Sequence, residues 1–366
     1  FRFYFMKFAI ACGGTGGHLF PGLAIAELLR SRGHEVLLLI SEKQIDAIAV
    51  RDRTDFEIKK IASIGMPSIW SLQIFPFAAK FITGFFNCWS LFRSWRPSAV
   101  LGMGGFTSTA PILAGRLLKT PTFIHESNAI PGKANRINAK LADTVLLGFA
   151  ECGHYFPAKP TQVTGTPIRT SLRGAVDRER AKRNLRLKSG LQTVAVFGGS
   201  QGAHGINEAV VAALHHFAMK PVQFIHLTGR EDHQLVYERY QKEGIPAFVA
   251  AFHYQMEDVY GAADLIVARS GAASLSEIAY FGLPTILIPY PFATDNHQAL
   301  NAAIFSRNSA AEVLEGTDAN GERIGHLIDE LLSDPKRRRS LAERMRSMAI
   351  TDAANKIADF LEAQGK

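Results

Sequence analysis

The sequence of 366 residues has few cysteines and lacks several short motifs that would assign a chemistry directly. Its three cysteines, Cys12, Cys88 and Cys152, lie far apart and form neither a CxxC pair nor a Cys/His metal spacing, so a reducing cytoplasm is the expected compartment. No glycine loop ends in Gly-Lys-Ser or Gly-Lys-Thr, which excludes a kinase-type P-loop. No low-complexity or disordered tract is visible in the chain.

The charge balance is basic and the length favours two domains. A formal net charge of +8 and a pI of about 9.4 predict an anionic partner, which could be a nucleic acid, a phosphorylated small molecule or an anionic membrane surface. No recognised nucleic-acid motif is present, so nucleic acid is not expected. A chain of this length exceeds the size at which one hydrophobic core usually keeps growing.

Glycine is concentrated in loops that follow short apolar runs. Residues 7–11 predict a buried strand, residues 13–17 form a glycine loop, and residues 21–33 have helical spacing. The same order returns at residues 193–197 and 198–205, and a third loop follows a strand at Leu101. Strand, loop, helix and strand make one βαβ unit of a parallel sheet. The sequence therefore predicts an α/β protein with two doubly wound, Rossmann-like halves.

These loops are suited to anions. Unpaired N–H groups and the helix dipole favour negative charge at a helix start, and glycine lets a phosphate approach the main chain. Nicotinamide binding is a minor alternative. Glu42 after the second strand could bind a ribose, but the GxGxxG pattern fails at Leu19. Ordinary tight turns are the structural alternative for any single loop. Two such halves with ligands in a cleft between them describe many nucleotide-sugar transferases.

The expected organisation has three parts. Residues 1–167 form the first domain, residues 168–340 the second, and residues 341–366 a charged amphipathic helix expected to pack back toward the first domain. The linker lies in residues 155–169, which hold three prolines. Phe1–Phe5 is expected to be a disordered or mis-started extension before Met6.

In combination and order, six motifs resemble the MurG family of bacterial N-acetylglucosaminyltransferases, glycosyltransferase family 28. They are GGTGGHLFPGLAIAE, LGMGGFTSTAPILAG, HESNAIPGKANR, GTPIR, GGSQGAHGIN and RSGAASLSEIAYFGLPTILIPYPFATDNHQALNA. The resemblance implies a GT-B fold and inverting transfer of GlcNAc from UDP-GlcNAc to the C4 hydroxyl of MurNAc in undecaprenyl-diphospho-MurNAc-pentapeptide (lipid I), giving lipid II for peptidoglycan. It also implies peripheral attachment at the cytoplasmic face of the bacterial plasma membrane and a place in a cell-wall or division complex.

The resemblance also carries over a set of donor contacts by motif. They fall on Thr15, Gly16, Gly17, Asn128, Arg169, Ser200, Ala272, Ala273, Ser274, Leu275, Ser276, Glu277 and Gln298. Two departures stand out: Thr166 replaces an asparagine that the family often carries, and His253 stands where the family uses a backbone or aliphatic contact to uracil. No DxD motif occurs, so a carboxylate-held metal is not needed and no cofactor is expected, with divalent-metal stimulation left open.

Displacement of a diphosphate needs a base for the attacking hydroxyl. His18 beside the first loop is the candidate base, because imidazole titrates near working pH; the alternative role is a local hydrogen bond at the helix start. Glu126 is the second candidate base and could equally cap the following helix, while His125 is expected to pack or bond locally. Glu277 is expected to bind ribose hydroxyls.

An aromatic segment, residues 69–95, raises the question of a membrane. It is interrupted by Pro76 and Lys80 and is too short for a span of about 20 apolar residues, so an interfacial patch is expected. The alternative is a helix packed on the sheet. The predicted patch residues are Phe81, Phe85, Trp89 and Phe92, with Lys80 and Arg93 meeting anionic lipid.

Three other functions stay open at this point. A transferase making glycosyl-diacylglycerol would share most of the motifs. A UDP-GlcNAc 2-epimerase would share the twin-domain fold but need no acceptor and no membrane patch. A non-catalytic nucleotide-sugar-binding scaffold of the division machinery would tolerate loss of His18 and Glu277.

Overall fold

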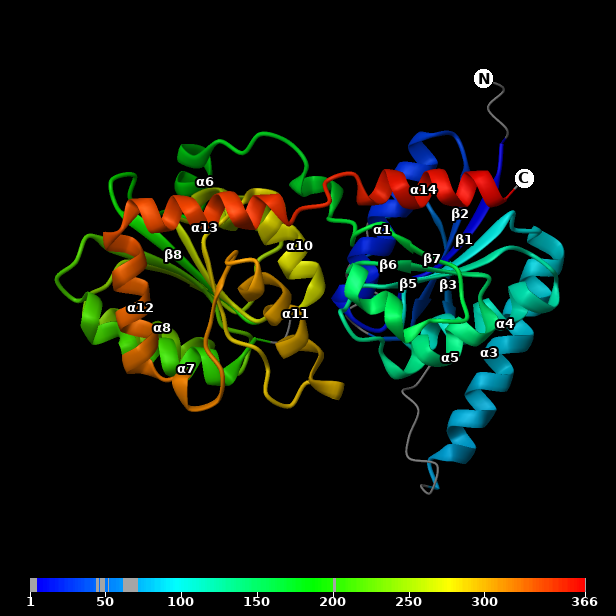
Figure 1. Ribbon diagram of the computed structural model, residues 1–366, viewed down its shortest axis with the longest axis horizontal. Helices are drawn as coiled ribbons and strands as arrows, with labels where there is room; N and C mark the ends of the chain where they lie inside the picture. Colours follow the sequence, from blue (N-terminus) through cyan, green and yellow to red (C-terminus); the bar gives the residue numbers. More distant parts are fainter. Residues whose placement is uncertain are drawn as a thin grey trace. The chain divides into compact units, whose positions relative to one another are not determined.

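The computed structural model describes residues 5–43, 46, 50–51, 53–61, 72–199 and 202–365. It divides the chain into two units, the first comprising Phe1–Thr170 with Ile350–Lys366 and the second Ser171–Ala349 (Figure 1). Each unit is a parallel sheet with helices on both faces, which confirms the predicted α/β class and its two doubly wound halves. Of the predicted extension Phe1–Phe5, residues 1–4 lie outside the described residues, and Phe5 is exposed.

The first unit is built on a sheet of seven parallel strands in the order β3-β2-β1-β4-β5-β6-β7. The strands are β1 Lys7–Ala11, β2 Glu35–Ser41, β3 Glu57–Ile61, β4 Ala99–Gly102, β5 Thr122–Glu126, β6 Thr144–Leu147 and β7 Thr161–Val163. The helices are α1 Gly16–Ser31, α3 Ile74–Trp95, α4 Thr109–Leu117, α5 Lys133–Leu141 and α14 Ala353–Gln364, with 3-10 turns η1 Phe106–Ser108, η2 Ala150–Tyr155 and η3 Thr170–Leu172.

Side-chain alternation along β1 divides the core of the first unit between the two faces of its sheet. Phe8 and Ile10 pack with α1 and α14, whereas Ala9 and Ala11 pack on the other face with α3 and α4. The sheet order reverses between β1 and β4, which pair directly. The loops after these two strands therefore open at the same edge, which is where open α/β sheets bind ligands.

The end of the chain differs from the prediction. A single helix over residues 341–366 is wrong, because α13 (Pro335–Ser347) belongs to the second unit and α14 to the first. The Asp334 side chain accepts from the backbone amides that follow Pro335, which starts α13 earlier than the sequence suggested. α14 is tied to α1 by Arg32, whose guanidinium donates to Asp359, Glu362 and Asn355.

The second unit repeats the architecture with a sheet of six parallel strands in the order β10-β9-β8-β11-β12-β13. The strands are β8 Gln192–Phe197, β9 Val222–Leu227, β10 Ala247–Ala250, β11 Leu265–Ala268, β12 Thr285–Leu287 and β13 Glu312–Val313. The helices besides α13 are α6 Arg178–Asn184, α7 His204–Ala213, α8 His233–Glu243, α9 Met256–Ala262, α10 Ala272–Phe281, α11 His297–Arg307 and α12 Gly321–Ser333, with 3-10 turns η4 Leu214–Phe217, η5 Thr294–Asn296 and η6 Gly316–Asp318.

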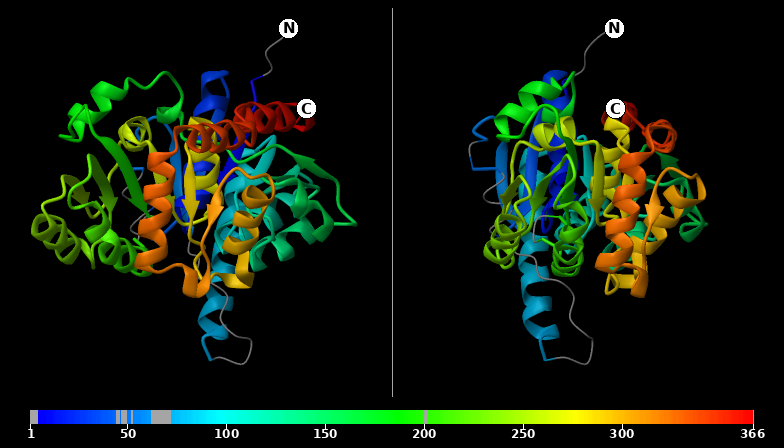
Figure 2. Two further views of the ribbon diagram at one scale, coloured as in Figure 1. Left: turned by 60° about the vertical axis from the view of Figure 1, so that its left-hand side comes forward. Right: turned by 90° about the vertical axis from the view of Figure 1, so that its left-hand side faces the viewer.

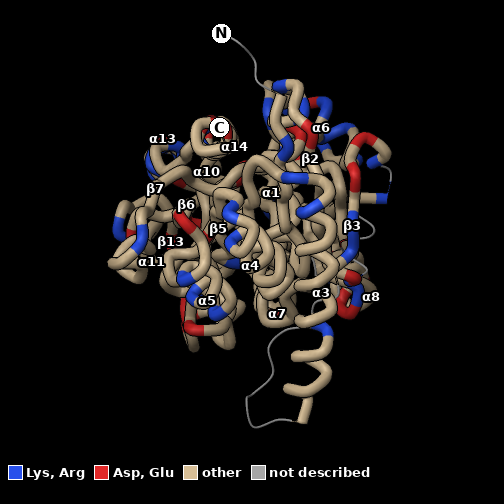
Figure 3. The backbone as a smooth tube through the Cα atoms, turned by 90° about the vertical axis from the view of Figure 1, so that its right-hand side faces the viewer, with Lys and Arg blue, Asp and Glu red and all other residues tan. Residues whose placement is uncertain are grey.

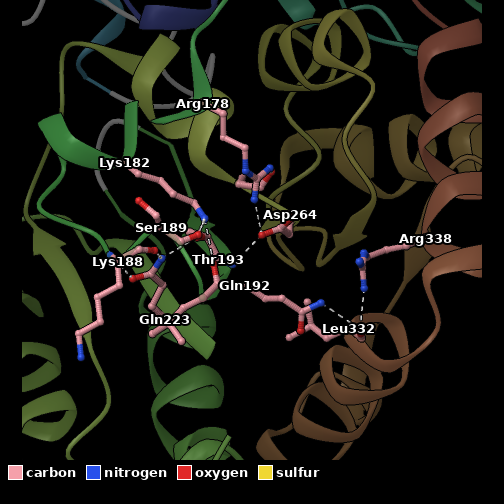
Figure 4. Close-up of polar contacts among 12 residues, drawn as sticks. Arg178, Lys182, Lys188, Ser189, Gln192, Thr193, Gln223, Asp264, Leu332 and Arg338 are labelled. Carbon is pink, nitrogen blue, oxygen red and sulfur yellow. Dashed lines mark hydrogen bonds and ion pairs between the residues drawn. The ribbon is translucent and has the colours of Figure 1, made fainter. Parts of the chain in front are cut away.

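Polar contacts fix the starts of the two central strands of the second unit (Figure 4). Asp264, just before β11, accepts from the Thr193 amide of β8 at 2.8 Å and from the Arg178 guanidinium at 2.6 Å. The side-chain amide of Gln223 on β9 donates to the Thr193 hydroxyl at 3.1 Å. These bonds set the register of β8, β9 and β11, and with it the height at which their following loops emerge.

Helix α3 extends beyond the sheet of its own unit and carries few charged residues (Figure 2, Figure 3). Among the described residues, no helix is long and apolar enough to cross a membrane. The predicted membrane face is wrong in part: Phe92 is 1% exposed, and Phe81, Phe85 and Trp89 pack against the core of the first unit. This face has the role given by the alternative reading, a helix packed on the sheet.

The exposed face of α3 is a different apolar stripe. It is formed by Phe75, Ile82 and Phe86, which are 70%, 53% and 56% exposed and lie at helical spacing. Arg93 falls on the same stripe because it is 18 residues, about five turns, beyond Phe75. Lys80 is exposed as predicted.

Candidate functional site

The first glycine loop joins β1 to α1 and is held from below by Asp46. An ideal Cβ on Gly13 would lie 2.3 Å from the Ser41 amide nitrogen, so only glycine fits there. One Asp46 oxygen accepts from the Gly14 amide at 2.7 Å and from the Ser41 amide and hydroxyl at 3.1 and 2.5 Å. This carboxylate was not anticipated from the sequence, where it is separated from the loop by 32 residues.

Helix α1 begins at Gly16 with no side chain capping its first turn. Thr15 at the N-cap has an extended backbone, and its hydroxyl lies 3.3 Å from His18 Nδ1 instead. The first-turn N–H groups, including those of Gly16 and Gly17, have no acceptor within the helix. A helix start of this kind can receive an anion, and the predicted donor contacts of Thr15, Gly16 and Gly17 stay predictions.

His18 lies half-buried between the first and third glycine loops. An ideal Cβ on Gly104 would come within 2.9 Å of His18 Nε2, and Gly104 and Gly105 have φ of +109° and +69°. Burial lowers the pKa of His18, while the charges of Glu126 and Asp46 oppose this shift. The imidazole is therefore neutral at neutral pH and able to accept a proton.

The Glu126 carboxylate is fully occupied by local donors. Oε1 accepts from the Asn128 amide and side chain at 2.9 and 3.1 Å, and Oε2 accepts from the Gly132 amide at 3.1 Å and the Asn135 side chain at 2.9 Å. Four donors on one buried carboxylate favour the capping role over that of a base. Glu126 thereby also holds Asn128, a predicted donor contact, in place.

Two further residues of the first unit were named from the sequence, His125 for a local role and Arg169 as a donor contact, and the donor contact stays a prediction. His125 is buried, and its Nε2 lies 2.9 Å from the Gly165 carbonyl oxygen, which fits a local bond. The Arg169 guanidinium lies 5.0 Å from the centre of the Phe20 ring, two residues after His18. The structure thus brings the first loop, His18 and Arg169 to one end of α1.

The second glycine loop joins β8 to α7, and Ser200 with Gln201 lies outside the described residues. Gly202 has a φ of +80°, and an ideal Cβ there would lie 2.2 Å from the Thr228 carbonyl oxygen. The side-chain amide of Asn207 donates to the same carbonyl at 2.8 Å and to the Asp232 carboxylate at 2.6 Å. His204, at the start of α7, lies 2.9 Å from Asp232, which raises its pKa and favours a positive charge beside the loop.

The predicted donor contacts on α10, residues 272–277, include both buried and half-buried residues. Ala272 and Leu275 are buried, and the Leu275 amide already donates to the Gly271 carbonyl at 2.9 Å, so Leu275 has a packing role. Ala273, Ser274 and Ser276 are half-buried at the first turns of the helix.

Glu277 is 7% exposed and accepts from the Tyr260 hydroxyl at 2.8 Å. A buried carboxylate is costly unless it is hydrogen-bonded. The Tyr260 hydroxyl supplies such a bond and orients Glu277, which is therefore not an ordinary surface glutamate. Tyr260 itself was not singled out from the sequence.

Gln298 and Arg269 shape the loop after β12. Gln298 Oε1 accepts from the Tyr290 amide at 2.9 Å, and its backbone oxygen accepts from the Ser270 hydroxyl at 2.7 Å. Arg269 was not predicted either, although it opens the longest of the six motifs. Its guanidinium donates to the carbonyls of Ile288 and Pro289 and lies over the Tyr290 ring.

Both halves of the chain match one family. Residues 8–147 match the Glycosyltransferase family 28 N-terminal domain, and residues 193–361 match the Glycosyltransferase family 28 C-terminal domain. The chain belongs to glycosyltransferase family 28. It is therefore a glycosyltransferase, and the resemblance stated from its motifs is confirmed.

Relatives within family 28 match over nearly the whole chain. A protein of Geobacter sulfurreducens is 39% identical over 98% of both chains, and one of Halothermothrix orenii is 37% identical over 99% of this chain and 100% of that protein. Both are named UDP-N-acetylglucosamine–N-acetylmuramyl-(pentapeptide) pyrophosphoryl-undecaprenol N-acetylglucosamine transferase.

Solved structures agree with the family 28 assignment. MurG of Acinetobacter baumannii has a TM-score of 0.76 at 25% identity, covering 98% of this chain and 99% of that one. UDP-GlcNAc 2-epimerase from Neisseria meningitidis, bound to UDP-GlcNAc, has a TM-score of 0.69 at 14% identity over 98% and 100%, which shows the fold alone. The predicted GT-B fold is confirmed.

The described residues around the family 28 motifs hold no group of metal-ligating side chains; the one such group lies elsewhere in the second unit. His253, in the segment that departs from the family pattern, is half-buried beside the Phe248 ring, and burial lowers its pKa. A neutral, partly buried imidazole is thus the group that this chain offers at that position.

The polar network under the second glycine loop predicts a pH effect on stability. Burial lowers the pKa of His226 to about 3, and its Nε2 lies 3.0 Å from Asn207 Oδ1. Between pH values of about 3 and 6.5 the unfolded chain binds a proton that the folded chain does not, so stability is lost as the pH falls. We expect the unfolding free energy of wild type relative to His226→Gln to drop by about 2 kcal/mol between about pH 7.5 and about pH 5.

Denaturant unfolding of both proteins at the two pH values measures this difference. Gln can still donate to Asn207 but does not titrate, so carboxylates elsewhere affect both proteins equally. A pH-independent difference between the two proteins would contradict the buried neutral state of His226.

Proposed function

We propose that this chain transfers GlcNAc from UDP-GlcNAc to the C4 hydroxyl of MurNAc in undecaprenyl-diphospho-MurNAc-pentapeptide, with inversion, forming a β(1→4) link in lipid II and releasing UDP. The observation that carries the proposal is the similarity over 98–100% of both chains to relatives named for this transfer. The glycine loops, the neutral His18 and the buried Glu277 support it, because the reaction needs an anion site, a base and a ribose ligand.

The donor is bound mainly by the second unit. Glu277 accepts from the ribose hydroxyls, the start of α7 receives the diphosphate, and Gln298 contacts the sugar. Leaving-group charge is stabilised by helix N–H groups and by a cation such as His204 or Arg169, so no metal is required for the chemistry. Divalent-metal stimulation stays a prediction.

His18 accepts the proton of the acceptor hydroxyl. The attacking oxygen forms the new glycosidic bond while the bond from the anomeric carbon to the diphosphate breaks, and UDP leaves with the electron pair. Since burial lowers the pKa of His18, the base is already neutral at working pH and needs no prior deprotonation. Asp46 positions the first glycine loop, and Glu126 positions the loop between β5 and α5.

The protein acts at the cytoplasmic face of the plasma membrane as a peripheral enzyme. The exposed stripe of Phe75, Ile82 and Phe86, ending at Arg93, supports this proposal, because apolar side chains next to a cation suit an anionic lipid surface. Association with other wall-synthesis or division proteins stays a prediction.

Incubation with labelled UDP-GlcNAc and a short-chain lipid I analogue, followed by linkage analysis, tests the function. We expect a β(1→4) product with wild type and a kcat lowered about 10²–10⁴-fold in His18→Ala, with the Kd for UDP-GlcNAc within about twofold of wild type, because a general base acts in the transition state. His154→Ala, an exposed histidine of the same unit, should leave kcat unchanged.

Full turnover by His18→Ala would overturn the base assignment. Transfer to diacylglycerol in place of lipid I, or conversion of UDP-GlcNAc without any acceptor, would replace the proposed function by lipid glycosylation or epimerisation. Cells that tolerate His18→Ala combined with Glu277→Ala would indicate a scaffold.

Glu277→Ala should raise the Kd for UDP-GlcNAc by about 10–100-fold, the effect of losing hydrogen bonds to a charged group. Tyr260→Phe is the matched variant, because it removes only the hydroxyl that orients the carboxylate, and we expect it to raise the Kd less than about tenfold. Isothermal titration calorimetry measures both. An unchanged Kd in a folded Glu277→Ala protein would remove Glu277 from the donor site.

Phe75→Ser combined with Phe86→Ser should weaken binding to vesicles containing anionic lipid by roughly tenfold or more, because two apolar side chains no longer leave water. Turnover of a water-soluble acceptor analogue should stay at the wild-type level. Met219→Ser, which changes a 96% exposed methionine of the other unit, is the control in a vesicle co-sedimentation assay. Equal vesicle binding by the double variant and wild type would place the membrane contact elsewhere.

A further inference from the structure

A group of histidines and one glutamate lies in the second unit where η4 meets α12, outside every motif discussed above. His215 and His216 are neighbours in η4, and Glu322 is in the first turn of α12. Ligand atoms of these three residues lie within 4.8 Å of one another. His326 follows Glu322 by four residues, so it lies on the same face of α12.

His216 is the most firmly placed of these residues. Its Nε2 is buried without a hydrogen-bond partner and lies 3.7 Å from Glu322 Oε2. An ideal Cβ on Gly325 would lie 2.4 Å from His216 Cδ2, so the absence of a side chain at Gly325 lets the ring sit against α12. Buried polar atoms in native proteins nearly always have a partner, and this nitrogen lacks one among the described residues.

The other groups are oriented as metal ligands usually are. His215 Nδ1 lies 2.8 Å from the Ala212 carbonyl oxygen, so it carries the proton and leaves the other ring nitrogen with its lone pair. His326 Nε2 lies 2.8 Å from Glu322 Oε1, which leaves Oε2 facing His216. Hydrogen bonds of this kind to the ligands fix their direction and protonation state.

A neighbouring cation is held away from the cluster by another carboxylate. Lys220, whose ammonium group lies over the Phe217 ring, is paired with Asp329 at 2.5 Å. Neutral imidazole and ionised carboxylate are the forms that bind metal.

We propose that His215, His216 and Glu322 bind one first-row transition-metal ion, with Zn²⁺ the best fit, and that His326 positions Glu322. Two imidazoles and a carboxylate are a common zinc ligand set, with water in the fourth position. Mg²⁺ and Ca²⁺ prefer all-oxygen sites and are not expected here. Bonds of about 2.1 Å place tetrahedral ligands about 3.4 Å apart, so the exposed side chains close by about an ångström on binding.

The ion would stabilise the second unit without taking part in glycosyl transfer. η4 directly follows α7, whose other end carries the glycine loop, and the 10 residues of α7 span about 15 Å. A metal bound to both η4 and α12 cross-links two elements that are more than 100 residues apart in the chain. Binding of the ion is therefore measured as a gain in protein stability, and this measurement does not depend on the proposed function.

Calorimetric titration of Zn²⁺ into chelator-treated, tag-free, full-length protein tests the proposal, with Co²⁺ absorption as a second readout of the ligand field. We expect one equivalent to bind and the Tm to rise by several degrees at one hundred times the Kd, because the folding constant then increases about a hundredfold. Glu322→Gln and His216→Ala should each raise the Kd by at least about tenfold and abolish the Tm rise. His326→Ala should raise the Kd by about 10–100-fold, as expected for a residue that orients a ligand.

His233→Ala, a histidine of α8 in the same unit, is the control and should bind Zn²⁺ like wild type. Glu322 is 69% exposed, so Glu322→Gln keeps the test valid if His216→Ala does not fold. No Zn²⁺ binding by wild type, or an unchanged Kd in folded Glu322→Gln, would overturn the proposal.

Discussion

The close approach of two bare stretches of main chain to His18 is the constraint on which the first unit depends. β1 and β4 pair directly at the point where the strand order reverses, so the loops after them emerge side by side. Side chains at Gly13 or Gly104 would collide with the Ser41 backbone or the His18 ring. The imidazole can occupy this place because Gly104 and Gly105 of the third loop lack side chains, while Gly13 lets the first loop lie against β2.

Burial between the loops also sets the chemistry of His18. The ring is buried where it lies against Gly104 and Gly105, and burial lowers its pKa. Asp46 holds the first glycine loop and Glu126 holds the loop between β5 and α5, each through hydrogen bonds from main-chain amides. The site is therefore a rigid frame around one proton acceptor, and its carboxylates act through the position of the loops.

The fold and the motif positions could be predicted from the sequence, because each strand, loop and helix start has a local signal. The alternation of Phe8, Ala9, Ile10 and Ala11 between two buried faces reads directly as a central parallel strand. Asp46 and Tyr260 could not be found in this way, since each acts on a residue that is distant in the chain. Likewise, neither His215 nor Glu322 shows from local spacing that a loop and a later helix bring them together.

Helix α3 shows why helical spacing alone does not assign a face. Its aromatic residues occupy both sides of the helix, so the same period fits a core-facing stripe through Phe85 and Phe92 and an exposed stripe through Phe75 and Phe86. The sheet decides between them, because Gly84 and Cys88 are small enough for close packing and fall on the first stripe. Small residues within an aromatic helix are thus a better sign of the buried side than the aromatic residues themselves.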